Sequence, residues 1–74
     1  MKMEELEKYW EKKVEIFFIE GNSYIGILSG TESEENEEGE YTGRELVVLD
    51  LTEHSYISFL PEEIEQIKSL DKVE

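Results

Sequence analysis

The sequence contains no cysteine, a single proline, one histidine and only seven basic residues. Without cysteine, the chain can form neither disulfides nor thiolate metal sites. The longest apolar run, Ile16 to Ile19, is far shorter than the ~20 residues that cross a bilayer, and no segment resembles a signal peptide. These absences predict a cytoplasmic protein that makes no membrane contact.

Acidic residues are abundant, with 20 Asp and Glu against 7 Lys and Arg, which gives a formal net charge of −13. A phosphate backbone needs Lys and Arg to displace its counterions, and a field this negative repels nucleic acid and anionic lipid. Only Lys12 and Lys13 are adjacent; the other basic residues are scattered. The charge therefore favours a basic protein as partner. The composition, rich in Glu and poor in Gln, also fits a thermophile.

The length of 74 residues predicts a single domain over residues 1–74. A folded chain of this size buries only roughly 60% of its unfolded surface, so a lone monomer is marginally stable. Small chains gain further stability from disulfides, metals or subunit contacts. Because disulfides and thiolate sites are excluded, subunit contacts are the expected source.

Residues 3–12 have the spacing of an amphipathic helix. Met3, Leu6 and Trp10 fall at i, i+3 and i+7, and Tyr9 extends the same stripe. Glutamates near the start and lysines near the end favour this helix electrostatically. We expect it to cover an open end of a β structure, with partner binding as the alternative.

The rest of the chain alternates strand patterns with turn residues. Thr31 to Glu40 carries six glutamates and no basic residue, which predicts a solvated acidic loop over residues 31–43. Pro61 ends a strand because proline lacks an N–H for the ladder. Residues 61–70 also fit a helix, since Pro-Glu-Glu is a favourable helix start. Strands are predicted over residues 13–20, 24–30, 44–51, 55–60 and 64–69, the last three within a C-terminal segment 44–70.

No residue pattern points to catalysis or to a metal. His54, the one histidine, lies in a predicted turn and is interpreted as a surface residue. Catalysis needs a nucleophile or base with a positioned partner, and none is visible. The acidic loop lacks the regular spacing of a calcium loop. We therefore predict a protein that is not an enzyme, with no catalytic residue, metal ligand or cofactor.

The segment from Lys13 to Leu28, KVEIFFIEGNSYIGIL, resembles the first half of the first motif of the Sm-like family. In that motif an alternating strand leads to a turn glycine, matched by Gly21, and then to a strand bent at a second glycine, matched by Gly26. A glycine inside a strand allows such a bend. The apolar spacing from Phe59 to Ile67 resembles the second motif. The resemblance implies a mostly β fold, with a short N-terminal helix and a five-stranded, strongly bent Sm-like barrel of the SH3 type.

The RNA-binding residues of this family cannot be carried over to the chain. Family members that bind RNA present an aspartate, an aromatic residue and an asparagine between their second and third strands. Here that segment is residues 31–43, made mostly of glutamate. The Arg-Gly pair of the second motif falls on Leu60 and Pro61. RNA association stays an alternative, with phosphate contacts expected at Lys12, Lys13 and Arg44.

The family's mode of assembly implies the preferred hypothesis, a non-catalytic oligomeric scaffold with lost or weakened RNA binding. Sm-like subunits form rings by pairing the fourth strand of one subunit with the fifth strand of the next, and a closed ring removes unpaired sheet edges. A further alternative is an SH3-like module that binds a basic or proline-rich peptide through aromatic residues. The residues expected at the subunit interface of the ring are Tyr56, Ile57, Phe59, Ile64 and Ile67.

Overall fold

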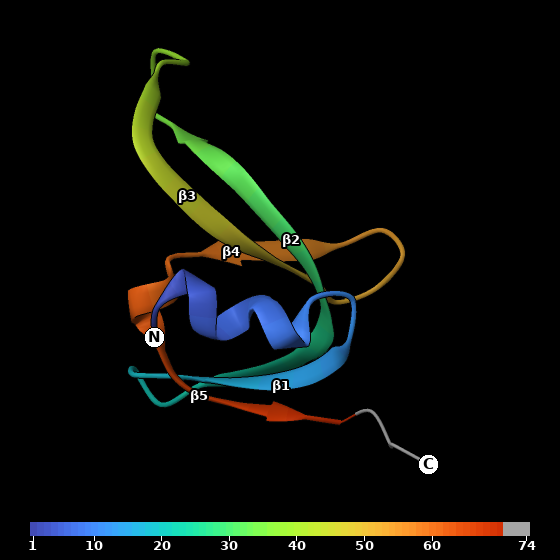
Figure 1. The fold of residues 1–74 in the computed structure, drawn as a ribbon. Helices are drawn as coiled ribbons and strands as arrows, with labels where there is room; N and C mark the ends of the chain where they lie inside the picture. Colours follow the sequence, from blue (N-terminus) through green and yellow to red (C-terminus); the bar gives the residue numbers. More distant parts are fainter. Residues whose placement is uncertain (71–74) are drawn as a thin grey trace.

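The computed structural model describes residues 1–70, so the last four residues of the predicted domain lie outside it. The chain is mostly β, with one short N-terminal helix and five strands (Figure 1). The elements are the 3-10 helix η1 (Met3–Tyr9), β1 (Lys13–Phe18), β2 (Ser23–Glu35), β3 (Tyr41–Asp50), β4 (Tyr56–Phe59), the 3-10 turn η2 (Pro61–Glu63) and β5 (Ile64–Ser69).

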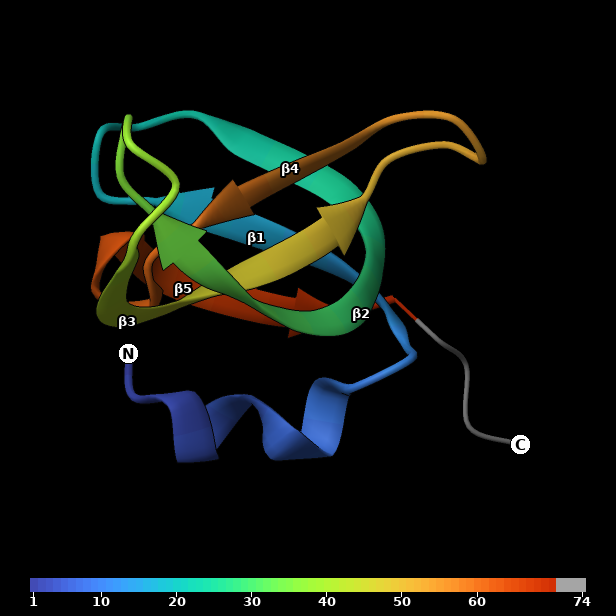
Figure 2. The same cartoon turned by 90° about the horizontal axis from the view of Figure 1, so that it is seen from above.

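All five strands belong to one antiparallel sheet, in the order β4-β3-β2-β1-β5. The predicted fold class is confirmed, except that the sheet is bent without closing, because β4 and β5 are its two ends. Figure 2 shows β2 curving strongly between its two partners. Its first part pairs with β1 as far as Ile27, and from Ile27 onward it pairs with β3.

The core follows from the alternation of side chains along each strand. On β1, Val14, Ile16 and Phe18 are buried, whereas Glu15 and Phe17 are half-buried on the opposite face. The same alternation on the neighbouring strands turns further apolar residues inward, and the resulting cluster lies inside the bend of the sheet. Its buried members are Leu6, Val14, Ile16, Phe18, Leu28, Val47, Leu49, Phe59, Ile64 and Ile67.

Helix η1 lies against the strands and seals one side of the core (Figure 2). Leu6 is fully buried, and Met3, Tyr9 and Trp10 pack on the cluster, as their spacing predicted. The helix is shorter than the predicted 3–12 range. It ends because Glu11 adopts a left-handed φ of 66° and donates its N–H to the Leu28 carbonyl oxygen, which turns the chain into β1.

The predicted acidic loop over residues 31–43 is wrong. β2 continues to Glu35 and β3 begins at Tyr41, so the two strands form a long hairpin that projects from the rest of the molecule (Figure 1). Only residues 36–40 connect the strands. The Asn36 side chain accepts hydrogen bonds from the N–H groups of Glu38 and Glu40, both at 2.9 Å, and Gly39 has a φ of 81°. These turn contacts join the strands and leave the Glu37 and Glu38 side chains exposed.

The two interpretations of residues 61–70 are each correct for part of the segment. Pro61–Glu63 forms η2, and Ile64–Ser69 forms β5. The Glu63 carboxylate accepts a 2.7 Å hydrogen bond from the Leu60 N–H and so closes the turn. The Ile19 N–H donates to the Glu63 carbonyl oxygen at 3.1 Å, which fixes η2 beside the end of β1.

Candidate interaction cleft and open sheet edges

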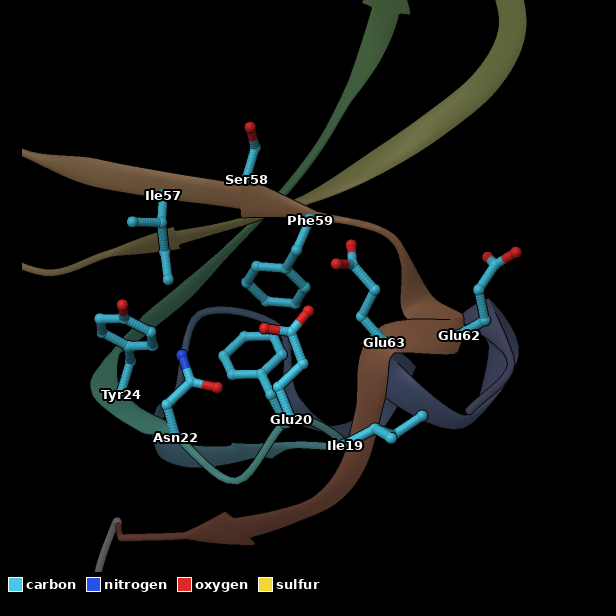
Figure 3. Close-up of a pocket in the computed structure, with 10 residues that line it drawn as sticks. Ile19, Glu20, Asn22, Tyr24, Ile57, Ser58, Phe59, Glu62 and Glu63 are labelled. Atoms are coloured by element: carbon cyan, nitrogen blue, oxygen red, sulfur yellow. The ribbon is translucent and has the colours of Figure 1, made fainter.

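A cleft of about 440 Å³ opens between β4 and the β1–β2 turn, with η2 at one end (Figure 3). Ligand-binding clefts fall within roughly 300–1,000 Å³, so the volume suits a single side chain or a small group. Figure 3 shows Ile57 and Phe59 extending from β4 toward Tyr24 and Asn22 on the opposite side. The cleft is lined by Phe18, Ile19, Glu20, Asn22, Tyr24, Ile57, Ser58, Phe59, Glu62 and Glu63.

Three aromatic rings form the apolar part of the cleft. Phe18 contacts Phe59 edge to face, with ring centroids 4.8 Å apart, and contacts Tyr24 at 5.8 Å with an interplanar angle of 75°. Edge-to-face contacts satisfy the ring quadrupoles and hold the rings at fixed angles. Phe18 and Phe59 are buried, whereas Tyr24 is 39% exposed, so Tyr24 presents its ring to a molecule in the cleft.

Three glutamates supply the charge of the cleft, and none of its lining residues is basic. Glu20 lies in the β1–β2 turn, and Glu62 and Glu63 lie on η2. Glu62 points outward in Figure 3 and is 3.9 Å from the Arg44 guanidinium, a long and exposed pair. Glu63 uses one carboxylate oxygen for the Leu60 N–H. The cleft thus joins an aromatic surface to carboxylates that can accept further hydrogen bonds.

The outer strands β4 and β5 carry backbone groups that have no partner strand within residues 1–70. Alternate residues of an antiparallel strand direct their N–H and C=O groups to the same side. The Leu70 N–H donates to the Lys13 carbonyl oxygen, so the outward groups of β5 are those of Ser69 and Ile67. The Ser55 carbonyl oxygen accepts from Leu51, so the outward groups of β4 belong to Tyr56 and Ser58. Each edge therefore presents two such residues.

The expected interface residues fall into two groups. Phe59, Ile64 and Ile67 are buried in the core of the chain, so in an assembly they would contribute mainly through the backbones of β4 and β5. Their alternation turns them inward, toward Phe18 and Ile16 rather than outward. Tyr56 is 58% exposed and Ile57 is half-buried, so these two side chains are accessible.

The three expected phosphate contacts do not form one patch. Lys12 and Lys13 lie at the start of β1, where the Leu28 N–H donates to the Lys12 carbonyl oxygen. Arg44 lies beside Glu62 of η2, which is fixed at the opposite end of β1. A six-residue strand spans roughly 17 Å, so the two positions are separated by the length of β1.

His54 is exposed in the β3–β4 turn, as predicted, and its N–H donates to the Thr52 hydroxyl at 3.2 Å. Across residues 1–70, no three His, Asp or Glu side chains are arranged to hold a metal ion. None of the helices in this part of the chain has the length and hydropathy of a membrane span.

Comparison with family models, curated proteins and solved structures finds no match to this chain. The sequence did not indicate that these residues form a cleft, and of its lining residues only Ile57 and Phe59 were expected at a site, the subunit interface. Glu20 and Tyr24 flank the β1–β2 turn, whereas Glu63 comes from η2, a distant segment that only the folded sheet brings to them. The sequence does contain one indication of the site. Ile19 and Glu20 directly follow the apolar strand and place an apolar and an acidic side chain at the same turn.

Proposed function

We propose that the chain is a non-catalytic assembly module of the Sm-like type, which pairs with further copies of itself through β4 and β5 and recruits a basic partner protein in the cytoplasm. The observation that carries the proposal is the position of these strands at the two ends of an open sheet. Each end has two residues with outward backbone groups, so β4 of one copy can accept β5 of another.

Two further properties support assembly. The unpaired edge of a small sheet is an aggregation hazard, and pairing with an identical copy removes it in a defined way. The accessible side chains of Tyr56 and Ile57 on β4 would add apolar contacts beside the paired backbones. Aromatic residues such as tyrosine are enriched in protein interfaces.

The alternative of RNA association gains no support from the arrangement of basic residues. Binding through several phosphates needs neighbouring cations, whereas Arg44 is next to Glu62 and distant from Lys12 and Lys13. The net charge of −13 adds long-range repulsion.

The substitution Ser69→Pro tests assembly, because proline removes an N–H that points away from β1. Ser69 is exposed, and the extended residue before it already has the conformation that proline requires of its neighbour. We expect the parent chain to sediment as a multiple of 8.7 kDa at tens of micromolar, and Ser69→Pro to sediment as a folded 8.7 kDa monomer.

Ser69→Ala is the matched control, since it removes the hydroxyl and keeps the N–H. It should retain the mass of the parent assembly. A parent chain that is monomeric at these concentrations would contradict the proposal, as would a Ser69→Pro variant of unchanged mass. Circular dichroism of each variant shows whether the fold is intact.

A further inference from the structure

We propose that the cleft between β4 and the β1–β2 turn binds an arginine or lysine side chain on a basic segment of a partner protein. This deepens the proposed recruitment of a basic partner and is independent of assembly through β4 and β5. It rests on two properties that meet at this place, an exposed aromatic ring and glutamates that line the same cleft from the β1–β2 turn and from η2.

The aromatic surface suits the long stem and the charged head of a basic side chain. Such side chains bury their methylene groups on apolar surface while the charge stays near polar atoms. Phe18 and Phe59 are held edge to face and provide the apolar surface, and Tyr24 offers an accessible ring. A cation over the face of a tyrosine ring is attracted by the ring quadrupole.

The carboxylates select the charge of the ligand. Glu20 enters from the β1–β2 turn and Glu63 from η2, and both carboxylates lie on the η2 side of the cleft, where a cation could meet them (Figure 3). Glu20 has no hydrogen bond or ion pair within residues 1–70, and one Glu63 oxygen is committed to the Leu60 N–H. Hydrogen bonds between an ionised donor and a carboxylate are stronger than neutral ones.

Other classes of ligand fit this chemistry less well. A phosphate group would face three glutamates with no basic side chain among the lining residues. A purely apolar ligand would leave the carboxylates with no partner of opposite charge. A second copy of the chain would bring mostly acidic side chains to a cleft that already holds three glutamates. A basic partner segment gains from both the ring and the charge.

Fluorescence anisotropy with a short peptide, in which arginine and serine alternate and which carries an uncharged dye, tests the proposal. A second peptide with citrulline in place of every arginine has the same shape without the charge. We expect the arginine peptide to bind, its affinity to fall with added salt, and the citrulline peptide to bind far more weakly. Amide chemical-shift changes should be centred on the cleft.

Two matched pairs of variants locate the site. Glu20→Gln with Glu63→Gln should weaken binding about fivefold, the effect of losing two solvent-exposed ion pairs. Glu37→Gln with Glu38→Gln removes the same charge at the hairpin tip and should change binding less than about twofold, because salt screens distant charges. Tyr24→Leu should weaken binding about threefold through the lost cation–ring contact, and Tyr41→Leu is its control on the exposed hairpin.

Equal losses in the cleft variants and the hairpin variants would overturn the proposal, since binding would then follow net charge alone. Equal affinity for the two peptides would overturn it as well. Binding that appears only in Ser69→Pro would mean that a neighbouring copy occupies the cleft, which also contradicts it. The mass of the assembly reports on the proposed function separately, and we expect Glu20→Gln with Glu63→Gln to leave that mass unchanged.

Discussion

Gly26 lies where β2 leaves β1 and turns toward β3. A Cβ atom at this position would overlap the Asp50 carbonyl oxygen and lie 3.0 Å from the Asp50 carbonyl carbon and 3.1 Å from Leu49 Cγ. The obstacle is the backbone of β3, which cannot move back because Leu49 and Val47 are fully buried. Glycine is therefore required here by the close approach of two strands.

Gly26→Ala should destabilise the chain by at least about 3 kcal/mol, because the added methyl group meets backbone atoms in a packed region. Gly39→Asn is the control. Its site has a φ of 81° and no atom within 4 Å of an added Cβ, and asparagine tolerates the left-handed region. We expect a loss within about 1 kcal/mol there. Urea denaturation measures both, and similar losses in the two variants would contradict the steric explanation.

The sequence predicted the special glycines and the inward alternation of β1, because both are local properties of the chain. Gly21 adopts a φ of 105° in the turn that was expected at that position. The cleft is different, since Phe18, Tyr24 and Phe59 come from three strands and meet only after the sheet has bent. No pattern within a single segment of the sequence indicates that these three rings will be in contact.

The β2–β3 hairpin carries much of the acidic charge and little of the core. Beyond the pair Glu32 and Leu46, its strands contribute none of the buried residues. Replacement of residues 33–45 by Asn-Gly should give a two-residue hairpin turn and a chain that still folds. We expect its melting temperature to stay within about 5 °C of the parent, a change near 1 kcal/mol for a domain of this size. Loss of the cooperative thermal transition would show that the hairpin supports the core.

The run of glutamates over residues 31–43 predicts a solvated loop, but a hairpin that projects from the sheet also leaves most of these carboxylates in water. Thr31 and Ser33 alternate with glutamates and pair with Val47 and Glu45 on β3. The Thr42 hydroxyl donates to the Glu34 carboxylate at 2.8 Å, a cross-strand contact that stabilises the ribbon. Asn36 and Gly39 are typical turn residues, and with this alternation they could have indicated a hairpin.

At the scale of the whole molecule, the net charge of −13 opposes the compact state through self-repulsion. Salt screens this repulsion, so the melting temperature should rise as sodium chloride is added at neutral pH. A variant with glutamine at residues 34, 35, 37 and 38 carries four fewer negative charges and should show a smaller rise. Thermal scans followed by circular dichroism measure both chains. A melting temperature that falls with salt would mean that attractive pairs such as Arg44 with Glu62 dominate.

The pairing of β1 with β5 has a consequence for the chain while it is being made. β1 emerges from the ribosome before β2, β3 and β4, yet its partner on one side, Ile64–Ser69, is made after all three. Val14 pairs with Ser69 across most of the sequence. Until then β1 has an open backbone edge and an uncovered apolar face, a combination that invites pairing between nascent chains. Translation that stops before residue 64 would yield a fragment in which this edge of β1 stays exposed. Such fragments are natural targets for chaperones and proteases.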